Sequence, residues 1–389
     1  MIAPFIVLLV AWAIASRVEL FGDAAQAMIM VLPYVVAILA LFMGFWYQNS
    51  NSFYLVCFLV FSYAFLNIAA SKPPMIYNAV AFISILLPIN ALWLGFSKER
   101  GVVSSYGRNK AMIIMVQIIW IFISMMGKSS VPVTEGITQP VISPSVLNII
   151  LFVLSICILL ANYILKNHYL SLTFVAILLT SYIALHFAHR ILIIAVFITA
   201  IFIIIIMALM DMSYSLAFYD TLTGVLSRRA LDQEFLKLRN KYAIAMVDLD
   251  HFKQINDKYG HDIGDEVLKM VASVLNTTSG RGKVFRYGGE EFVVLFADMS
   301  YNEIMYKLER IRKAIERRPF ILRADDRPKK KQDAPSNSSA KGKGTIRVTV
   351  SIGVAQKNEL LKTSHDVIRK ADEALYRSKN NGRNCVTKI

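Results

Sequence analysis

Cysteine is scarce in this sequence, and charge is nearly missing from its first half. The only cysteines are Cys57, Cys157 and Cys385. None has a C-x-x-C neighbour and two fall in apolar segments, which argues against a disulfide framework or a zinc cluster. Residues 1–210 hold only thirteen Asp, Glu, Lys and Arg residues, whereas residues 211–389 hold fifty-six. A membrane-embedded half joined to a water-soluble half is therefore expected.

The hydrophobic content is high, at 56%, and the net charge is +15. Both halves are net basic, which suits an anionic ligand or the acidic inner leaflet of a membrane without identifying either. Residues 1–16 have the apolar core of a signal peptide, but no basic segment precedes them and further apolar segments follow. They are therefore expected to remain as an uncleaved first span.

Apolar runs fill the first half. A helix needs about 20 such residues to cross the hydrocarbon core, and the first and fifth runs are shorter. We expect eight spans, or six or seven if the shorter runs do not cross, over residues 1–16, 28–47, 53–70, 78–96, 111–126, 147–165, 170–188 and 191–210. An all-α polytopic membrane domain over residues 1–210 follows, with a sensory or anchoring role.

The orientation of this domain follows from its loops. The densest basic cluster lies in residues 97–110, and positively charged loops stay in the cytoplasm. Counting onward places everything after Met210 in the cytoplasm and the loop 127–144 outside. The expected location is the inner, cytoplasmic membrane of a bacterium.

No charged residue lies inside a predicted span, which weakens a transporter or channel function. His186 and His189 could share a helical face as metal or haem ligands or a pH sensor, although interfacial polar residues are the more ordinary explanation. Kinks and interhelical hydrogen bonds account for Pro33, Pro88, Asn67, Asn90 and Asn162. The sequence does not identify a signal ligand or a protein partner for this half.

The second half alternates helix and strand. The order predicts an α/β sandwich of ferredoxin type, with helices on one face of a mostly antiparallel sheet. The expected helices are 231–240, 262–276, 301–318 and 364–378, and the expected strands are 242–247, a hairpin over 283–296, 345–355 and 384–387.

Two segments join or interrupt these domains. Residues 211–219 continue the last span as a short helical connector, through which a shift of that span could reach the soluble half. Residues 323–344 are rich in Lys, Asp, Pro, Ser and Gly, and they predict a basic, flexible insertion. The insertion is either a solvated loop or a contact for acidic lipid or nucleotide.

The hairpin carries an unusual tip. Two strand-length apolar runs flank Gly288 and Gly289, which favour a tight turn. Glu290 and Glu291 follow, and neighbouring side chains on a strand point to opposite faces. The two glutamates should therefore have different roles, although this tetrapeptide alone also fits an exposed acidic turn.

A second acidic segment follows the strand at 242–247. Asp248 comes at the end of this apolar strand, and Lys253 follows five residues later. Carboxylate oxygens suit a hard cation, and a lysine can neutralise phosphate oxygens. If the hairpin pairs with this strand, the sequence predicts a phosphoryl- or nucleotidyl-transfer site that uses magnesium. Taken alone, the segment also fits a polar loop.

Residues 220–389, about 44% of the chain, resemble the GGDEF domain of diguanylate cyclases. Six motifs occur in the family's order. They are D-x-L-T-G and R-R at 220–229, D-x-D-x-F-K-x-x-N-D at 248–257, H-x-x-G-D at 261–265, the name-giving motif in its Glu form at 286–292, a strand at 350–354, and A-D…A-L-Y…K…G-R-N at 371–384. The resemblance implies a nucleotide cyclase palm-type ferredoxin-like fold.

The resemblance also implies the chemistry. The family joins two GTP into cyclic di-GMP with release of two pyrophosphates, and each domain of a homodimer holds one GTP. Magnesium, or manganese in its place, would be bound by Asp248, Glu290 and the main-chain carbonyl of Leu249. The implied catalytic residues are Glu290, Lys253 and Glu291. The implied GTP contacts are Phe252 and Lys253 to phosphate, Asn256 and Asp265 to guanine, Gly288 and Gly289 along the nucleotide, and Lys379 and Arg383 to the terminal phosphates.

One motif of the family is missing. Many members have an R-x-x-D product-inhibition site, whose two positions here hold Ser279 and Gly282, with Arg281 out of register. No product inhibition through that primary site is expected, and a secondary site stays open.

The sequence as a whole predicts a membrane-bound diguanylate cyclase that acts as a homodimer through its GGDEF and membrane domains. Its partners would be GTP, cyclic di-GMP and the lipid bilayer, with no nucleic-acid polymer among them. The alternative is a degenerate nucleotide-binding module without activity, which the retained acidic residues disfavour.

Overall fold

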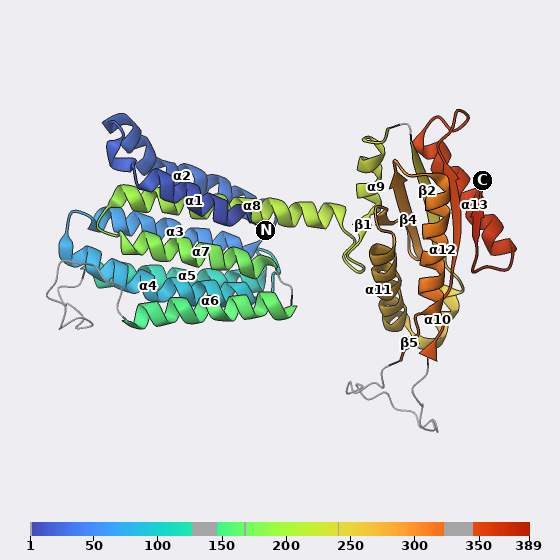
Figure 1. Ribbon diagram of the computed structural model, residues 1–389. Helices are drawn as coiled ribbons and strands as arrows, with labels where there is room; N and C mark the ends of the chain where they lie inside the picture. Colours follow the sequence, from blue (N-terminus) through green and yellow to red (C-terminus); the bar gives the residue numbers. More distant parts are fainter. Residues whose placement is uncertain (1, 127–145, 167–168, 240, 323–344) are drawn as a thin grey trace, which may run out of the picture. The chain divides into compact units, whose positions relative to one another are not determined.

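The computed structural model describes residues 2–126, 146–166, 169–239, 241–322 and 345–389. The chain divides into two compact units, Met1–Ser213 and Tyr214–Ile389, and each is described by itself (Figure 1). The predicted insertion 323–344 and outer loop 127–144 lie outside the described residues. The domain boundaries and the connector stay predictions.

The first unit is helical, and all eight apolar segments predicted from the sequence form helices. They are α1 (Ala3–Ala15), α2 (Asp23–Trp46), α3 (Ser50–Ala69), α4 (Pro73–Phe96), α5 (Ser105–Met126), α6 (Val146–Lys166), α7 (Tyr169–His186) and α8 (Ile191–Phe218). Within the described ranges, six are long and apolar enough to cross a membrane, whereas Ala3–Ala15 and Leu170–His186 are shorter.

The predicted interhelical hydrogen bonds are confirmed. A buried amide needs a partner, and another helix supplies it where water is excluded. The bonds join Asn67 Nδ2 to Tyr34 Oη (3.1 Å), Asn90 and Gln117 reciprocally (2.8 and 3.0 Å), and Asn162 Nδ2 to Ser171 Oγ (2.8 Å). These contacts tie α2 to α3, α4 to α5 and α6 to α7.

The segments predicted as spans contain no Asp, Glu, Lys or Arg, but the helices extend beyond these segments. The span Ser105–Ile123 begins before its apolar part, so Arg108 and Lys110 belong to the helix. Lys110 is only 4% exposed, and its Nζ donates to Ser50 Oγ at 2.8 Å and to Asn51 Oδ1. Hydropathy marked only the apolar part of α5, and the polar first turn of α3 compensates the buried ammonium group.

The proposed histidine pair does not share a helical face. Helix α7 ends at His186, and His189 lies in the following turn. Both are exposed, and His186 packs edge-on against the ring of Phe187 with centroids 5.1 Å apart. This favours the interfacial explanation.

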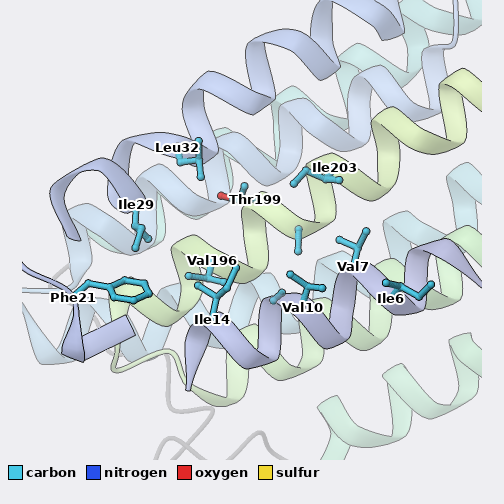
Figure 2. Close-up of a pocket in the computed structure, with 12 residues that line it drawn as sticks. Ile6, Val7, Val10, Ile14, Phe21, Ile29, Leu32, Val196, Thr199 and Ile203 are labelled. Atoms are coloured by element: carbon cyan, nitrogen blue, oxygen red, sulfur yellow. The ribbon is translucent and has the colours of Figure 1, made fainter. Parts of the chain in front are cut away.

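A cavity of about 470 Å³ lies between α1, α2 and α8, and Figure 2 shows the side chains that line it. Its lining is aliphatic and aromatic apart from Thr199. The Thr199 hydroxyl donates to the carbonyl of Ala195 at 2.8 Å within α8, so it is already satisfied. The cavity therefore presents an apolar surface.

The second unit is built on a six-stranded mixed sheet of order β1-β3-β4-β2-β7-β8. Its strands are β1 (Leu226–Ser227), β2 (Tyr242–Leu249), β3 (Lys283–Arg286), β4 (Glu291–Ala297), β7 (Val350–Gln356) and β8 (Val386–Lys388). Its helices are α9 (Arg228–Phe235), α10 (Phe252–Tyr259), α11 (His261–Thr278), α12 (Tyr301–Arg317) and α13 (Ser364–Asn380). The inner order β3-β4-β2-β7 confirms the predicted ferredoxin-type arrangement.

Helices cover both faces of this sheet, so the expectation of one covered face is wrong (Figure 1). Alternate residues of β2 enter two separate cores. Ala243, Ala245 and Val247 pack with α10, α11 and α12, whereas Ile244 and Met246 pack with α9 and α13. Each central strand is buried on both sides, which explains its continuous apolar sequence.

Several predicted elements differ in detail. The strand 345–355 is divided, because β6 (Thr345–Ile346) pairs with β5 (Phe320–Ile321) in a separate two-stranded sheet. Helix α10 was not among the predicted helices, and a polar loop was one alternative for its segment. Strand β1 was not predicted because two residues carry no periodicity. Helix α9 ends at Phe235, five residues before its predicted end.

Close packing of α13 on β7 yields a stability prediction. A Cβ at Gly353 would lie 2.0 Å from the Leu375 nitrogen and 2.2 Å from the Ala371 oxygen, both of which are backbone atoms of α13. We expect Gly353→Ala to destabilise the second unit by about 1–3 kcal/mol. Hydrogen exchange of β2 and β7 in the full chain measures this, and Gly289→Ala, where a Cβ meets nothing within 4 Å, is the matched control.

Candidate active site

The register of β2 against β4 brings two carboxylates together. Asp248 pairs with Glu291 in this antiparallel ladder, and directly opposite residues project from the same face of a sheet. Ile244 and Met246 fix that face as the one covered by α13. Glu290 lies one residue before β4, and its carbonyl accepts from the Leu249 amide at 3.4 Å.

Helix α13 supplies the positive charge of the site. A capping box between Thr363 and Asp366 fixes the start of this helix. Four turns later, Lys379 Nζ lies 3.0 Å from Asp248 Oδ2. The Asp248 side chain is only 6% exposed, so the contact is a largely desolvated ion pair at the end of β2.

The carboxylates repel one another in a partly dry setting. Burial raises the pKa of Asp248 above its usual value, although Lys379 opposes the increase. Burial and the charge of Asp248 raise the pKa of Glu290 and of Glu291. A divalent cation would relieve this repulsion, because its positive charge favours the ionised form of all three carboxylates.

The donor set fits a hard cation. Asp248 and Glu290 are oxygen donors at adjoining strand ends, and the main chain of Leu249 lies between them. Within the described residues, no group of three or more His, Cys, Asp or Glu side chains is arranged to hold a metal ion. The ligand set that the family resemblance implies, the two carboxylates and the Leu249 carbonyl, stays a prediction.

The start of α10 provides backbone donors. His251 adopts a left-handed conformation with φ 57° and turns the chain into the helix. The Phe252 side chain is buried in the core, so only its backbone is available to a ligand, whereas Lys253 is exposed. The first amides of a helix have no intrahelical acceptor, which makes them donors for an anion.

Two further predicted residues lie on adjoining helices. Asn256 is on α10, and Asp265 is exposed in the first turns of α11. A Cβ at Gly264 would lie 1.9 Å from Asn256 Oδ1, so the glycine permits this side chain to reach α11. Among the described residues, Asn256 Oδ1 is buried without a hydrogen-bond partner.

The hairpin tip is held from outside the site. The amides of Tyr287 and Gly288 both donate to the Glu291 carbonyl, at 2.8 and 3.2 Å. Arg286 Nη2 donates to the Gly289 carbonyl at 2.8 Å, and Arg286 Nη1 donates to Asp220 Oδ1 at 2.9 Å. The loop that carries Gly288 and Gly289 is thus anchored to the D-x-L-T-G segment.

Sequence reasoning missed the role of Asp250. This side chain is 6% exposed and accepts hydrogen bonds from Ser351 Oγ (2.6 Å), Thr349 Oγ1 (2.8 Å) and the Asn384 amide (3.1 Å). The acidic motif at 248–257 contains Asp250. A motif does not show which aspartate lies at the candidate site and which forms hydrogen bonds within the protein.

The R-x-x-D positions also have a structure. Ser279 Oγ donates to the Gly282 carbonyl at 3.0 Å, and the Gly282 amide donates back to the Ser279 carbonyl at 3.2 Å. Arg281 is exposed. The turn before β3 is therefore closed by two hydrogen bonds between Ser279 and Gly282, and its four residues contain no arginine–aspartate pair.

Carboxylates at adjoining strand ends beside a lysine, on a ferredoxin-like sheet, fit a metal-dependent nucleotidyl-transfer domain. Residues 217–385 match the family described as "Diguanylate cyclase, GGDEF domain". These residues form a GGDEF domain, as the six motifs predicted. The helical first unit lies outside the match.

Two curated relatives match this part of the chain. The matched part is 40% identical over 146 residues to diguanylate cyclase A of Treponema denticola, covering 37% of this chain and 34% of that protein. It is 34% identical over 185 residues to response regulator PleD of Caulobacter vibrioides, covering 46% of this chain and 37% of the relative. The chain therefore spans only about a third of the length of these relatives.

Solved structures include the coiled coil and GGDEF domain of DgcB from Caulobacter crescentus in complex with c-di-GMP. It is 29% identical, covers 47% of this chain and 92% of that chain, and has a TM-score of 0.41.

The Asp220–Arg286 anchor yields a testable prediction. Burial opposes ionisation of Asp220, but hydrogen bonds from Thr223 and Arg286 outweigh it and lower its pKa. Its stabilising effect is therefore present above about pH 4 and is lost as pH falls through the lowered value. We expect Asp220→Asn to speed hydrogen exchange at the hairpin tip about tenfold at pH 7.

The control for this anchor is the pH dependence itself. In the unsubstituted chain, exchange at the tip, corrected for intrinsic rates, should accelerate below about pH 4, whereas Asp220→Asn should lack this step. Equal pH dependence in both proteins would contradict an anchoring role for Asp220.

Proposed function

We propose that this protein is a membrane-bound diguanylate cyclase that condenses two GTP into cyclic di-GMP and two pyrophosphates. The observation that carries the proposal is the pairing of Asp248 with Glu291, with Lys379 held 3.0 Å from Asp248, inside a GGDEF domain. The curated relatives of this domain named above include a diguanylate cyclase, which supports the reaction class.

Asp248, Glu290 and the Leu249 carbonyl would hold a magnesium ion, with manganese as a substitute. When bound, the ion supplies Lewis-acid polarisation of phosphate oxygens. Glu290 accepts the proton of the attacking 3′-hydroxyl as a general base. Glu291, opposite Asp248, supports this carboxylate pair.

The remaining residues bind and orient the nucleotide. The exposed Lys253 stabilises charge that develops on the phosphates, and the backbone amides at Phe252 and Lys253 bind phosphate oxygens. Asn256 and Asp265 recognise guanine, since carboxylate and amide oxygens accept from its N1–H and amino group. Further contacts come from Gly288 and Gly289 along the nucleotide, and from Lys379 and Arg383 at the terminal phosphates.

The reaction requires two copies of the domain. Each copy holds one GTP, and the 3′-hydroxyl of each GTP attacks the α-phosphate of the other. Two phosphodiester bonds form and two P–O bonds to pyrophosphate break. We propose a homodimer through the GGDEF and membrane domains, regulated by the latter, because α8 is one helix from Ile191 to Phe218.

We propose the inner membrane of a bacterium, with eight crossings made by the six candidate spans together with α1 and α7. The four crossings α5 to α8 then separate residues 97–110 from the GGDEF domain and leave both on the cytoplasmic side. Lys98 and Arg100 lie between α4 and α5 and would mark the cytoplasmic side. GTP is available on that side. The signal that acts on the first unit stays unassigned.

Synthesis of cyclic di-GMP by the full chain with GTP and magnesium tests the proposal. We expect Glu290→Gln to lower the rate at least about 100-fold with the fold intact, because the proton acceptor and a cation ligand are lost. Glu359→Gln, an exposed glutamate after β7, is the control and should match the unsubstituted rate. Absence of product from a folded dimer would leave the degenerate nucleotide-binding module.

Product inhibition gives an independent prediction. Because Ser279 and Gly282 replace the R-x-x-D pair and bond to each other, added cyclic di-GMP should not slow synthesis through this turn. Initial rates measured with increasing product, for the unsubstituted chain and for Arg281→Ala, check this. Strong inhibition that Arg281→Ala removes would show that the turn still binds product.

A further inference from the structure

A polar ring joins α12 to the turn that carries Arg383. Arg312 Nη1 donates to Asn384 Oδ1 at 2.8 Å and to Glu316 Oε2 at 3.0 Å. Asn384 Nδ2 donates to Glu316 Oε1 at 2.8 Å. The side-chain amide of Asn384 is thus bonded through both its oxygen and its nitrogen to the Arg312–Glu316 ion pair of α12.

Arg312 is itself fixed in place. Its side chain is only 11% exposed, and its Nε and Nη2 atoms donate to Glu309, at 2.7 Å for the shortest contact. Three nitrogens of one planar group therefore face two carboxylates and an amide. A lysine would keep the charge but has one nitrogen and no fork.

The same turn is held from the opposite side by Asp250. Its Oδ2 atom accepts from the backbone amide of Asn384 at 3.1 Å, and its Oδ1 atom accepts from Ser351 Oγ at 2.6 Å. Asp250 lies two residues after Asp248. The strand end that bears the candidate cation ligand and the turn that bears Arg383 are therefore joined through one buried carboxylate.

The turn needs this support because its backbone is strained. Gly382, Arg383 and Asn384 all have positive φ, at 100°, 64° and 46°. A left-handed conformation costs a side-chain-bearing residue on the order of 1 kcal/mol, and it persists only where surrounding contacts determine it. Two such residues follow one another here, so the turn would relax if its contacts were lost.

We propose that Arg312, Glu316 and Asp250 are positioning residues that hold the 382–384 turn so that Arg383 meets the terminal phosphates of the nucleotide. The inference rests on the proposed function for the role of Arg383. Helix α12 contributes no residue to the predicted site. The proposal means that α12 nevertheless raises the affinity for the nucleotide.

Binding of 3′-deoxy-GTP to the full chain in magnesium tests the proposal apart from turnover, because this analogue has no attacking hydroxyl. We expect Arg312→Lys to weaken its binding about tenfold or more. For the reaction, KM for GTP should rise by a similar factor with kcat little changed, as expected when ground-state binding is lost. Arg317→Lys, an exposed arginine of the same helix, should change neither quantity.

Combination with Arg383→Ala separates positioning from a general loss of stability. If Arg312 acts through Arg383, Arg312→Lys should have no further effect on affinity once Arg383 is absent. Glu316→Gln, which keeps the side-chain shape, provides a second variant if Arg312→Lys does not fold. Additive losses in the double variant, or unchanged affinity in both single variants, would overturn the proposal.

The two proposals can fail separately. If the unsubstituted chain binds 3′-deoxy-GTP with the predicted coupling but makes no cyclic di-GMP, the positioning role stands and the proposed function fails. If synthesis occurs and the Arg312 and Glu316 variants bind the analogue normally, the function stands and the positioning role fails.

Discussion

The candidate site depends on one constraint, the antiparallel register of β2 between β4 and β7. This register sets Asp248 opposite Glu291 on one neighbour and opposite Ser351 on the other. A slip of one residue would turn every side chain of β2 to the other face. The two apolar cores prevent such a slip, because Ile244 and Met246 would exchange environments with Ala243, Ala245 and Val247. Packing far from the carboxylates therefore fixes their separation.

The two aspartates at the end of β2 have different partners. Lys379 reaches Asp248 directly, whereas Asp250 turns inward and is satisfied by its own neighbours. Two aspartates two residues apart thus have different partners, since Asp248 contacts Lys379 at the candidate site and Asp250 joins the strand end to the 382–384 turn. Burial and mutual repulsion raise the pKa of Asp248, Glu290 and Glu291, and a bound divalent cation would oppose this effect.

The membrane half poses a different physical problem. Asparagine side chains join its helices in pairs, and the ammonium group of Lys110 donates to Ser50 and Asn51 in the first turn of α3. A hydrophobic scan could not show this, since the scan detects where charge is rare and not where a buried charge has partners. The apolar cavity beside α8 likewise comes from packing, because its lining residues are ordinary membrane-helix residues in the sequence.

The sequence alone determined the helical first half, the ferredoxin-type order of the second, and the motifs that contain Asp248, Glu290 and Lys379. These features are local, because periodicity, glycines and strand-end carboxylates are visible within short windows. The tertiary structure decided which glutamate pairs with Asp248, that α9 and α13 cover the second face, and that Arg312 supports the turn of Arg383. Each of these depends on contacts between residues distant in sequence, and no local pattern specifies them.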